Sequence, residues 1–125
     1  MQIIKIDQCP DYIAPDNAIA KEFISPKNSP LENLSIAKIT IPPHTSVEKH
    51  YHLKSEEVYQ IIEGVGEMRL GNETQTVGPG EVVPIYPHTW HSIDNPSDQD
   101  LVMIVTCSPP WDANDQVFEP HVNKA

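Results

Sequence analysis

Short β-rich runs separated by turn-forming residues constrain the fold of this chain more than any other feature. Most runs are rich in Val, Ile, Thr or aromatic residues, and Gly, Pro, Asn or Ser follows each within two residues. The runs cover residues 36–41, 57–62, 67–70, 81–86, 91–93 and 101–107. Gly71-Asn72 predicts a tight hairpin turn, and no stretch repeats apolar residues at helical spacing. The pattern predicts an all-β sandwich or small barrel with little or no helix.

The chain length of 125 residues suits one domain with a single core. Residues 34–108 hold the β-rich runs and should form the barrel. Residues 1–33 should form an N-terminal arm, in which the run at 3–6 (IIKI) supplies an extra edge strand. Residues 109–125 should leave the barrel as a C-terminal tail that packs on it. This tail should place its two large aromatic side chains over an opening, Trp111 and Phe118.

The charge balance is acidic and excludes two classes of partner. Eighteen Asp and Glu residues face eight Lys and Arg residues, so the formal net charge is −10. Nucleic-acid binding needs clustered positive charge, and so does docking on an anionic membrane surface. Arg69 is the single arginine, so no fork of guanidinium groups is available to clamp a phosphate. We therefore expect a small-molecule substrate and neither nucleic acid nor membrane as a partner.

The chain start and the cysteines indicate a cytoplasmic protein. The first residues contain no apolar core of a signal peptide, and no run approaches the roughly 20 apolar residues of a membrane helix. Cys9 and Cys107 lie far apart in the sequence without a CxxC pair. We interpret them as reduced thiols, with Cys107 in the core.

The stretch KHYHLKSEEVYQIIEG gathers histidines and carboxylates ahead of a strand. On a strand, His50 and His52 point to the same face, whereas Tyr51 points away. Either Glu56 or Glu57 could add a carboxylate from the next strand, and the alternation of apolar residues does not choose between them. Without a further partner, the segment could equally be a polar hairpin with two surface histidines.

His91, at the start of the run at 91–93, supplies the further partner. Three imidazoles and one carboxylate suit Fe, Mn, Co, Ni, Cu or Zn better than Ca or Mg. The sequence thus contains the donors for one divalent transition metal ion.

At these residues the sequence resembles the cupin superfamily. Its first motif, G-x5-HxH-x3,4-E-x6-G, fits His50, His52, Glu57 and Gly64, and this spacing selects Glu57 over Glu56. Its second motif, G-x5-P-x-G-x2-H-x3-N, fits at the following positions: Gly80, His91 and Asn95. The resemblance spans about residues 36–107.

Three positions depart from the two motifs. His44 and His88 replace glycines, and Tyr86 replaces the proline. Histidine tolerates the left-handed backbone region better than most residues, so we interpret His44 and His88 as turn residues rather than as extra ligands. Tyr86 could line the mouth of the barrel.

The resemblance implies a double-stranded β-helix (jelly-roll) barrel with a metal ion held by His50, His52, Glu57 and His91. Four protein ligands leave one or two coordination positions for water or substrate. Each imidazole should donate its other ring N–H to a carbonyl or carboxylate, which fixes the tautomer.

We expect a metal-dependent enzyme that uses the ion as a Lewis acid for isomerase or lyase chemistry on a sugar or organic acid. Tyr59 shares the inward face of Glu57 and is either a catalytic acid or base or a packing residue. The match Glu57-x-Tyr59 also resembles metal-dependent lyases that cleave dimethylsulfoniopropionate. The alternatives are a metal-dependent dioxygenase and a non-catalytic module that binds a small molecule. Exposed strand edges predict a homodimer, with the run at 3–6 as a candidate for pairing.

Overall fold

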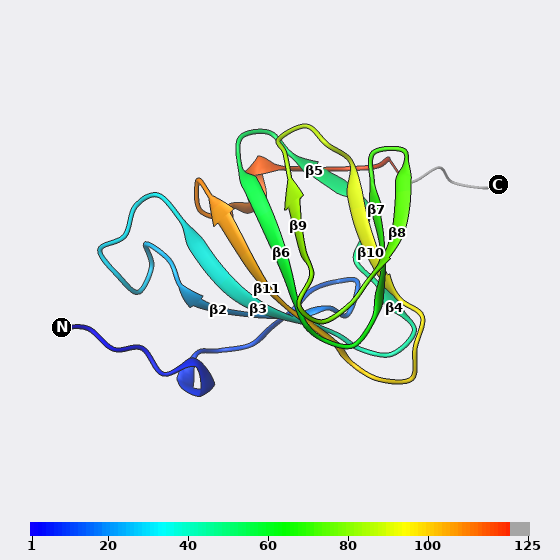
Figure 1. The fold of residues 1–125 in the computed structure, drawn as a ribbon. Helices are drawn as coiled ribbons and strands as arrows, with labels where there is room; N and C mark the ends of the chain where they lie inside the picture. Colours follow the sequence, from blue (N-terminus) through cyan, green and yellow to red (C-terminus); the bar gives the residue numbers. More distant parts are fainter. Residues whose placement is uncertain (121–125) are drawn as a thin grey trace.

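The computed structural model describes residues 1–120, which fold into two antiparallel sheets that lie face to face (Figure 1). The strand order in the first sheet is β1 (Tyr12–Ile13), β2 (Ile19–Ile24), β3 (Ser35–Ile41), β11 (Leu101–Ser108), β6 (Glu56–Glu63) and β9 (Val82–Ile85). The order in the second sheet is β12 (Gln116–Phe118), β5 (His50–His52), β10 (His91–Asn95), β7 (Gly66–Leu70) and β8 (Glu73–Val77), and β4 (Thr45–Ser46) also pairs with β10. The predicted all-β barrel with little helix is confirmed.

The described helical structure consists of two single 3₁₀ turns, η1 (Ile6–Gln8) and η2 (Ala113–Asp115). Among the described residues, no helix is long and apolar enough to cross a bilayer.

Each β-rich run predicted from the sequence corresponds to a strand, and the turn at Gly71-Asn72 joins β7 to β8 as predicted. The run at 3–6 is where the prediction was wrong. Its first three residues lie outside any strand, and Ile6 begins η1 with an exposed side chain. The edge of β3 is occupied instead by β2, a longer segment that pairs with β3 along most of its length. The predicted homodimer stays a prediction, and this run no longer offers a strand for it.

The interior is arranged in layers across β3, β11 and β6. Directly opposed residues form an apolar layer of Ile39, Met103 and Ile61. The next layer toward the site contains Ala37, Val105 and Tyr59, and the last contains Ser35, Cys107 and Glu57. The core therefore becomes more polar from the apolar layer toward the layer of Ser35, Cys107 and Glu57, and Glu57 lies on β6 at this polar end.

Asn95 closes the opposite end of β10 inside the protein. Its amide nitrogen donates to the backbone oxygen of Ile41 at 2.8 Å and to that of Gln99 at 2.7 Å. Its amide oxygen accepts from the backbone and the hydroxyl of Ser97. Because buried polar groups need partners, this one side chain ties β10 to the end of β3 and to the loop before β11.

The two histidines that replace motif glycines are turn residues, as predicted. His44 has a φ of 56° and His88 a φ of 62°, both in the left-handed region. Both side chains are exposed, and neither belongs to the cluster described below.

The described part of the tail returns to the barrel as a strand. Gln116 lies opposite His52 and Phe118 opposite His50, where β12 pairs with β5. The Phe118 ring lies 5.5 Å from the His50 ring, and the Trp111 backbone N–H donates to the Ser35 hydroxyl. The predicted tail runs to residue 125, and its last five residues lie outside the described part of the chain.

Candidate metal centre

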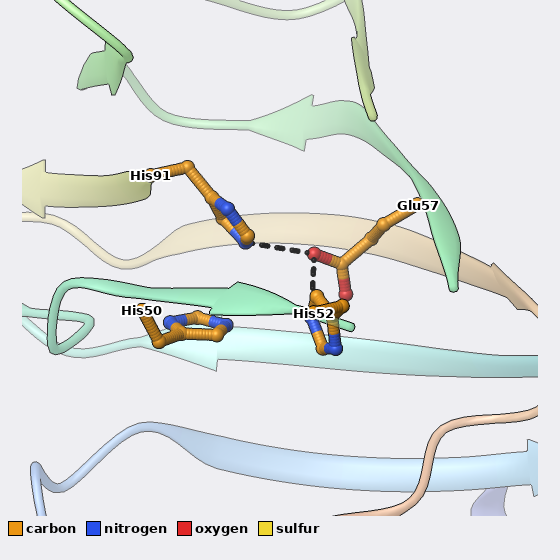
Figure 2. Close-up of side chains that lie close together, drawn as sticks. All are labelled: His50, His52, Glu57 and His91. Carbon is orange, nitrogen blue, oxygen red and sulfur yellow. Dashed lines mark hydrogen bonds and ion pairs between the residues drawn. The ribbon is translucent and has the colours of Figure 1, made fainter. Parts of the chain in front are cut away.

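Four side chains from three strands point toward one another in the interior (Figure 2). They are His50 and His52 from β5, Glu57 from β6 and His91 from β10. One potential ligand atom from each lies within 4.8 Å of the others, and their exposed fractions are 6%, 1%, 4% and 1%. The structure thus brings together the four residues that were predicted from the sequence as metal ligands.

Strand geometry explains why these residues meet. His50 and His52 are two residues apart on β5, so both rings project to the inner face. His91 is directly opposite His50 where β10 pairs with β5, and their ring centres are 4.3 Å apart. On β6, Glu57 is buried and Glu56 is exposed. Glu57 is therefore the glutamate on the inner face, which the alternation of apolar residues in the sequence could not decide.

Backbone carbonyls fix the orientation of two of the imidazoles. His50 Nδ1 lies 2.7 Å from the oxygen of Glu48, and His91 Nδ1 lies 2.8 Å from the oxygen of Thr89. A ring nitrogen can only donate to a carbonyl, so both Nδ1 atoms carry hydrogen and both Nε2 atoms can bind an ion. Burial, followed by the neighbouring His91, lowers the pKa of His50 to about 4, which keeps this imidazole in the neutral form that metals bind.

His52 gives the strongest sign that a cation fits here. Among the described residues, its two ring nitrogens are the buried side-chain atoms that lack a hydrogen-bond partner. Nε2 lies 3.3 Å from Glu57 Oε1, and Nδ1 lies 3.9 Å from Asp115 Oδ2. An unsatisfied buried polar atom costs free energy, and a metal ion beside Nε2 would remove that cost.

Glu57 has a different neighbour at each carboxylate oxygen. Oε1 lies 3.0 Å from His91 Nε2, and Oε2 lies 3.2 Å from the sulfur of Cys107. Burial alone would raise the pKa of Glu57, but the interactions with His52 and His91 outweigh it and hold this pKa well below its usual range. The carboxylate is therefore ionised, as a metal ligand must be.

Comparison with known proteins identifies the family of this chain. A family model, the cupin domain, matches residues 37–107. The chain belongs to the cupin family. The uncharacterized protein MJ1618 of Methanocaldococcus jannaschii is 34% identical to this cupin over 117 residues, which cover 92% of this chain and 94% of that one.

Two solved structures share the fold of this cupin at low sequence identity. A predicted oxalate decarboxylase from Thermotoga maritima has a TM-score of 0.78 and 18% identity, covering 86% of this chain and 99% of its own. Pac13 of Streptomyces, a nucleoside dehydratase, has a TM-score of 0.77 and 11% identity, covering 98% of this chain and 94% of its own. Identities this low show a common fold and nothing further about function.

Tyr59 lies next to the four-residue cluster of this cupin. It is buried on the inner face of β6, and its ring centre is 6.0 Å from that of His91. Burial, reinforced by the charge of Glu57, raises the pKa of Tyr59 well above its usual value. The phenol thus keeps its proton, and its catalytic role stays a prediction.

The polar side chains of two further residues, Cys107 and Asp115, lie beside the cluster and were not identified from the sequence as part of the site. Cys107 faces Glu57 from β11, and burial together with the Glu57 charge raises the pKa of its thiol well above the usual range. Asp115, in η2, accepts backbone N–H groups of Lys54 and Ser55 and so holds its carboxylate behind His52. Neither residue lies in a cupin motif, and only the fold brings them to the site.

A surface pocket of about 720 Å³ lies on the far side of His52. It is lined by residues of β2 and the β2–β3 loop, of the β5–β6 turn and of the tail, including Asp115 and Trp111. None of the four clustered residues lines it. The pocket therefore adjoins the back of the site and does not contain it.

Proposed function

We propose that this cupin is a metal-dependent enzyme that performs isomerase or lyase chemistry on a small oxygenated substrate. The observation that carries the proposal is the convergence of three imidazoles and one carboxylate, in which neither ring nitrogen of His52 has a hydrogen-bond partner among the described residues. Nitrogen and oxygen donors of this kind suit a divalent transition metal. When bound, such an ion supplies Lewis acidity toward a hydroxyl, carbonyl or carboxylate of the substrate.

Tyr59 is the residue we assign to proton transfer. Glu57 interacts with the two imidazoles and with the Cys107 thiol, and it also contributes to the raised pKa of the Tyr59 phenol. The Tyr59 phenol faces the same interior and carries its own proton, so its oxygen can deliver a proton to the substrate and take one back. The low accessibility of the cluster also keeps bulk water away from this step.

The described charges favour an unphosphorylated sugar or organic acid over a phosphosugar. Arg69, the single arginine, is half exposed and pairs with Asp94 at 3.2 Å. It is therefore already engaged by a carboxylate rather than available for a phosphate.

Metal content tests the proposal. Protein purified without added metal should contain about one transition metal ion per chain by elemental analysis, because the described residues 1–120 offer one complete ligand set. We expect Zn, Mn or Ni, with turnover in a screen of sugars and oxo acids. Iron or copper together with oxygen consumption would instead favour a dioxygenase. Ligand binding without turnover would favour a binding module, and protein that neither retains nor takes up an ion would refute the proposal.

Replacing Tyr59 with phenylalanine should lower kcat on the identified substrate by about 10²- to 10⁴-fold, the range typical of a lost general acid or base. The metal content should not change, because the phenol is outside the ligand set. Tyr51→Phe is the matched control, since Tyr51 lies between His50 and His52 on β5 but on its outer face. Unchanged turnover in Tyr59→Phe would restrict Tyr59 to packing.

A further inference from the structure

The thiol of Cys107 is placed at the metal centre by strand register. Cys107 lies directly opposite Glu57 where β11 pairs with β6, so the two side chains share the inner face. Both are buried, and the sulfur is 3.2 Å from Glu57 Oε2. A carboxylate can only accept hydrogen bonds, so the thiol is the donor.

The two carboxylate oxygens of Glu57 have different hydrogen-bond neighbours. Oε1 faces the imidazoles, at 3.0 Å from His91 Nε2 and 3.3 Å from His52 Nε2. Oε2 instead accepts the hydrogen bond of the Cys107 thiol. A free carboxylate can bind an ion through one or both oxygens, and a donor on one oxygen favours binding through the other.

We propose that Cys107 is a positioning residue that holds Oε2 of Glu57 and so presents Oε1 alone to the metal ion. Glu57 then binds through one oxygen, and a coordination position that a second oxygen would occupy is left for the substrate. This inference rests on the proposed function, because it takes the four-residue cluster to be a metal site. It adds a role for a residue that lies outside both cupin motifs.

The competing explanation is packing, since buried cysteine often behaves as a small apolar residue. Three substitutions separate the two. Cys107→Ser keeps a donor in a similar volume, Cys107→Ala removes the donor and some volume, and Cys107→Val removes the donor while filling the space. If the hydrogen bond matters, Cys107→Ser should behave like the wild type, and Cys107→Ala should behave like Cys107→Val. Packing alone does not predict this pattern.

Co²⁺ is the probe, because its visible absorption reports coordination number. We expect Cys107→Ala and Cys107→Val to weaken Co²⁺ binding by about tenfold, the lower end of the effect of losing a partner of a metal ligand. Their absorption should also weaken as Oε2 joins the ion and the coordination number rises. Cys107→Ser should retain most of the affinity and the wild-type spectrum. Cys9→Ala is the matched control, since Cys9 lies outside the cluster and its thiol contacts the Lys5 carbonyl.

Thermal unfolding of the metal-free variants shows whether each is folded, so that affinity is compared among folded proteins. Wild-type affinity and spectrum in both Cys107→Ala and Cys107→Val would overturn the inference while leaving the metal site intact. Equal losses in the serine and alanine variants would also overturn it. A wild-type protein that binds no Co²⁺ would overturn both this inference and the proposed function.

Discussion

Replacing His91 with asparagine should weaken metal binding by more than about 100-fold, since loss of a mere partner of a ligand already costs 10- to 100-fold. The asparagine amide nitrogen occupies the δ position and can keep the hydrogen bond that His91 Nδ1 makes to the Thr89 carbonyl. What it lacks is the ε nitrogen that lies 3.0 Å from Glu57 Oε1. The substitution therefore removes one ligand atom with little disturbance of β10. Competition with a chelator of known affinity measures the loss.

The matched control is His44→Asn. His44 is an exposed histidine paired with Asp98, and its φ of 56° is one that asparagine also tolerates. Metal affinity should be unchanged in this variant. Wild-type affinity in His91→Asn would contradict the proposed ligand set, and an equal loss in both variants would indicate a general effect of removing histidine.

Replacing Gly64 with alanine should destabilise the protein by about 4 kcal/mol, combining left-handed strain and overpacking, each worth 1–3 kcal/mol. Gly64 has a φ of 81°, where a side chain is strained. A Cβ there would also overlap the backbone oxygen of Asp100 and lie 3.0 Å from Leu101 Cα. Backbone atoms cannot rotate away as a side chain can. Denaturant unfolding measures the change, which is a large share of the usual stability of a domain.

Gly71→Ala separates the two causes. Gly71 also has a positive φ, 59°, but no atom of the described residues beyond its two chain neighbours lies within 4 Å of the place where a Cβ would stand. This variant should therefore lose only about 1 kcal/mol, from strain alone. Equal losses at both positions would show that the contact with Asp100 contributes nothing.

The metal-site residues could be predicted from the sequence because their spacing encodes the geometry. Neighbouring residues on one strand face are two apart, which predicted that His50 and His52 point the same way, and the spacing of the cupin motif selected Glu57. Alternation alone could not choose between Glu56 and Glu57. Val58 and Ile62 are apolar yet exposed on the outer face of β6, so in the sequence the outer face looks as apolar as the inner one.

Cys107 and Asp115 could not be assigned in the same way. Cys107 reaches Glu57 through the register of two strands about fifty residues apart, and Asp115 reaches His52 through a tail with no motif. The strand β2 was missed for a local reason, since Lys21 and Glu22 interrupt its apolar pattern. Lys21 donates a hydrogen bond to the backbone oxygen of Cys9 and forms an ion pair with Asp11. Tertiary contacts therefore stabilise a strand that could not be predicted from its composition.

The separation of the four clustered residues along the chain has a consequence for how the protein matures. Glu57 and His91 are 34 residues apart, and β12, near the end of the chain, pairs with the strand that carries His50 and His52. A growing polypeptide on the ribosome cannot assemble this set until the chain has emerged beyond His91. On the proposed function, the ion would therefore bind only after this segment has been synthesised, and the metal pool of the surrounding compartment would help to decide which element is bound.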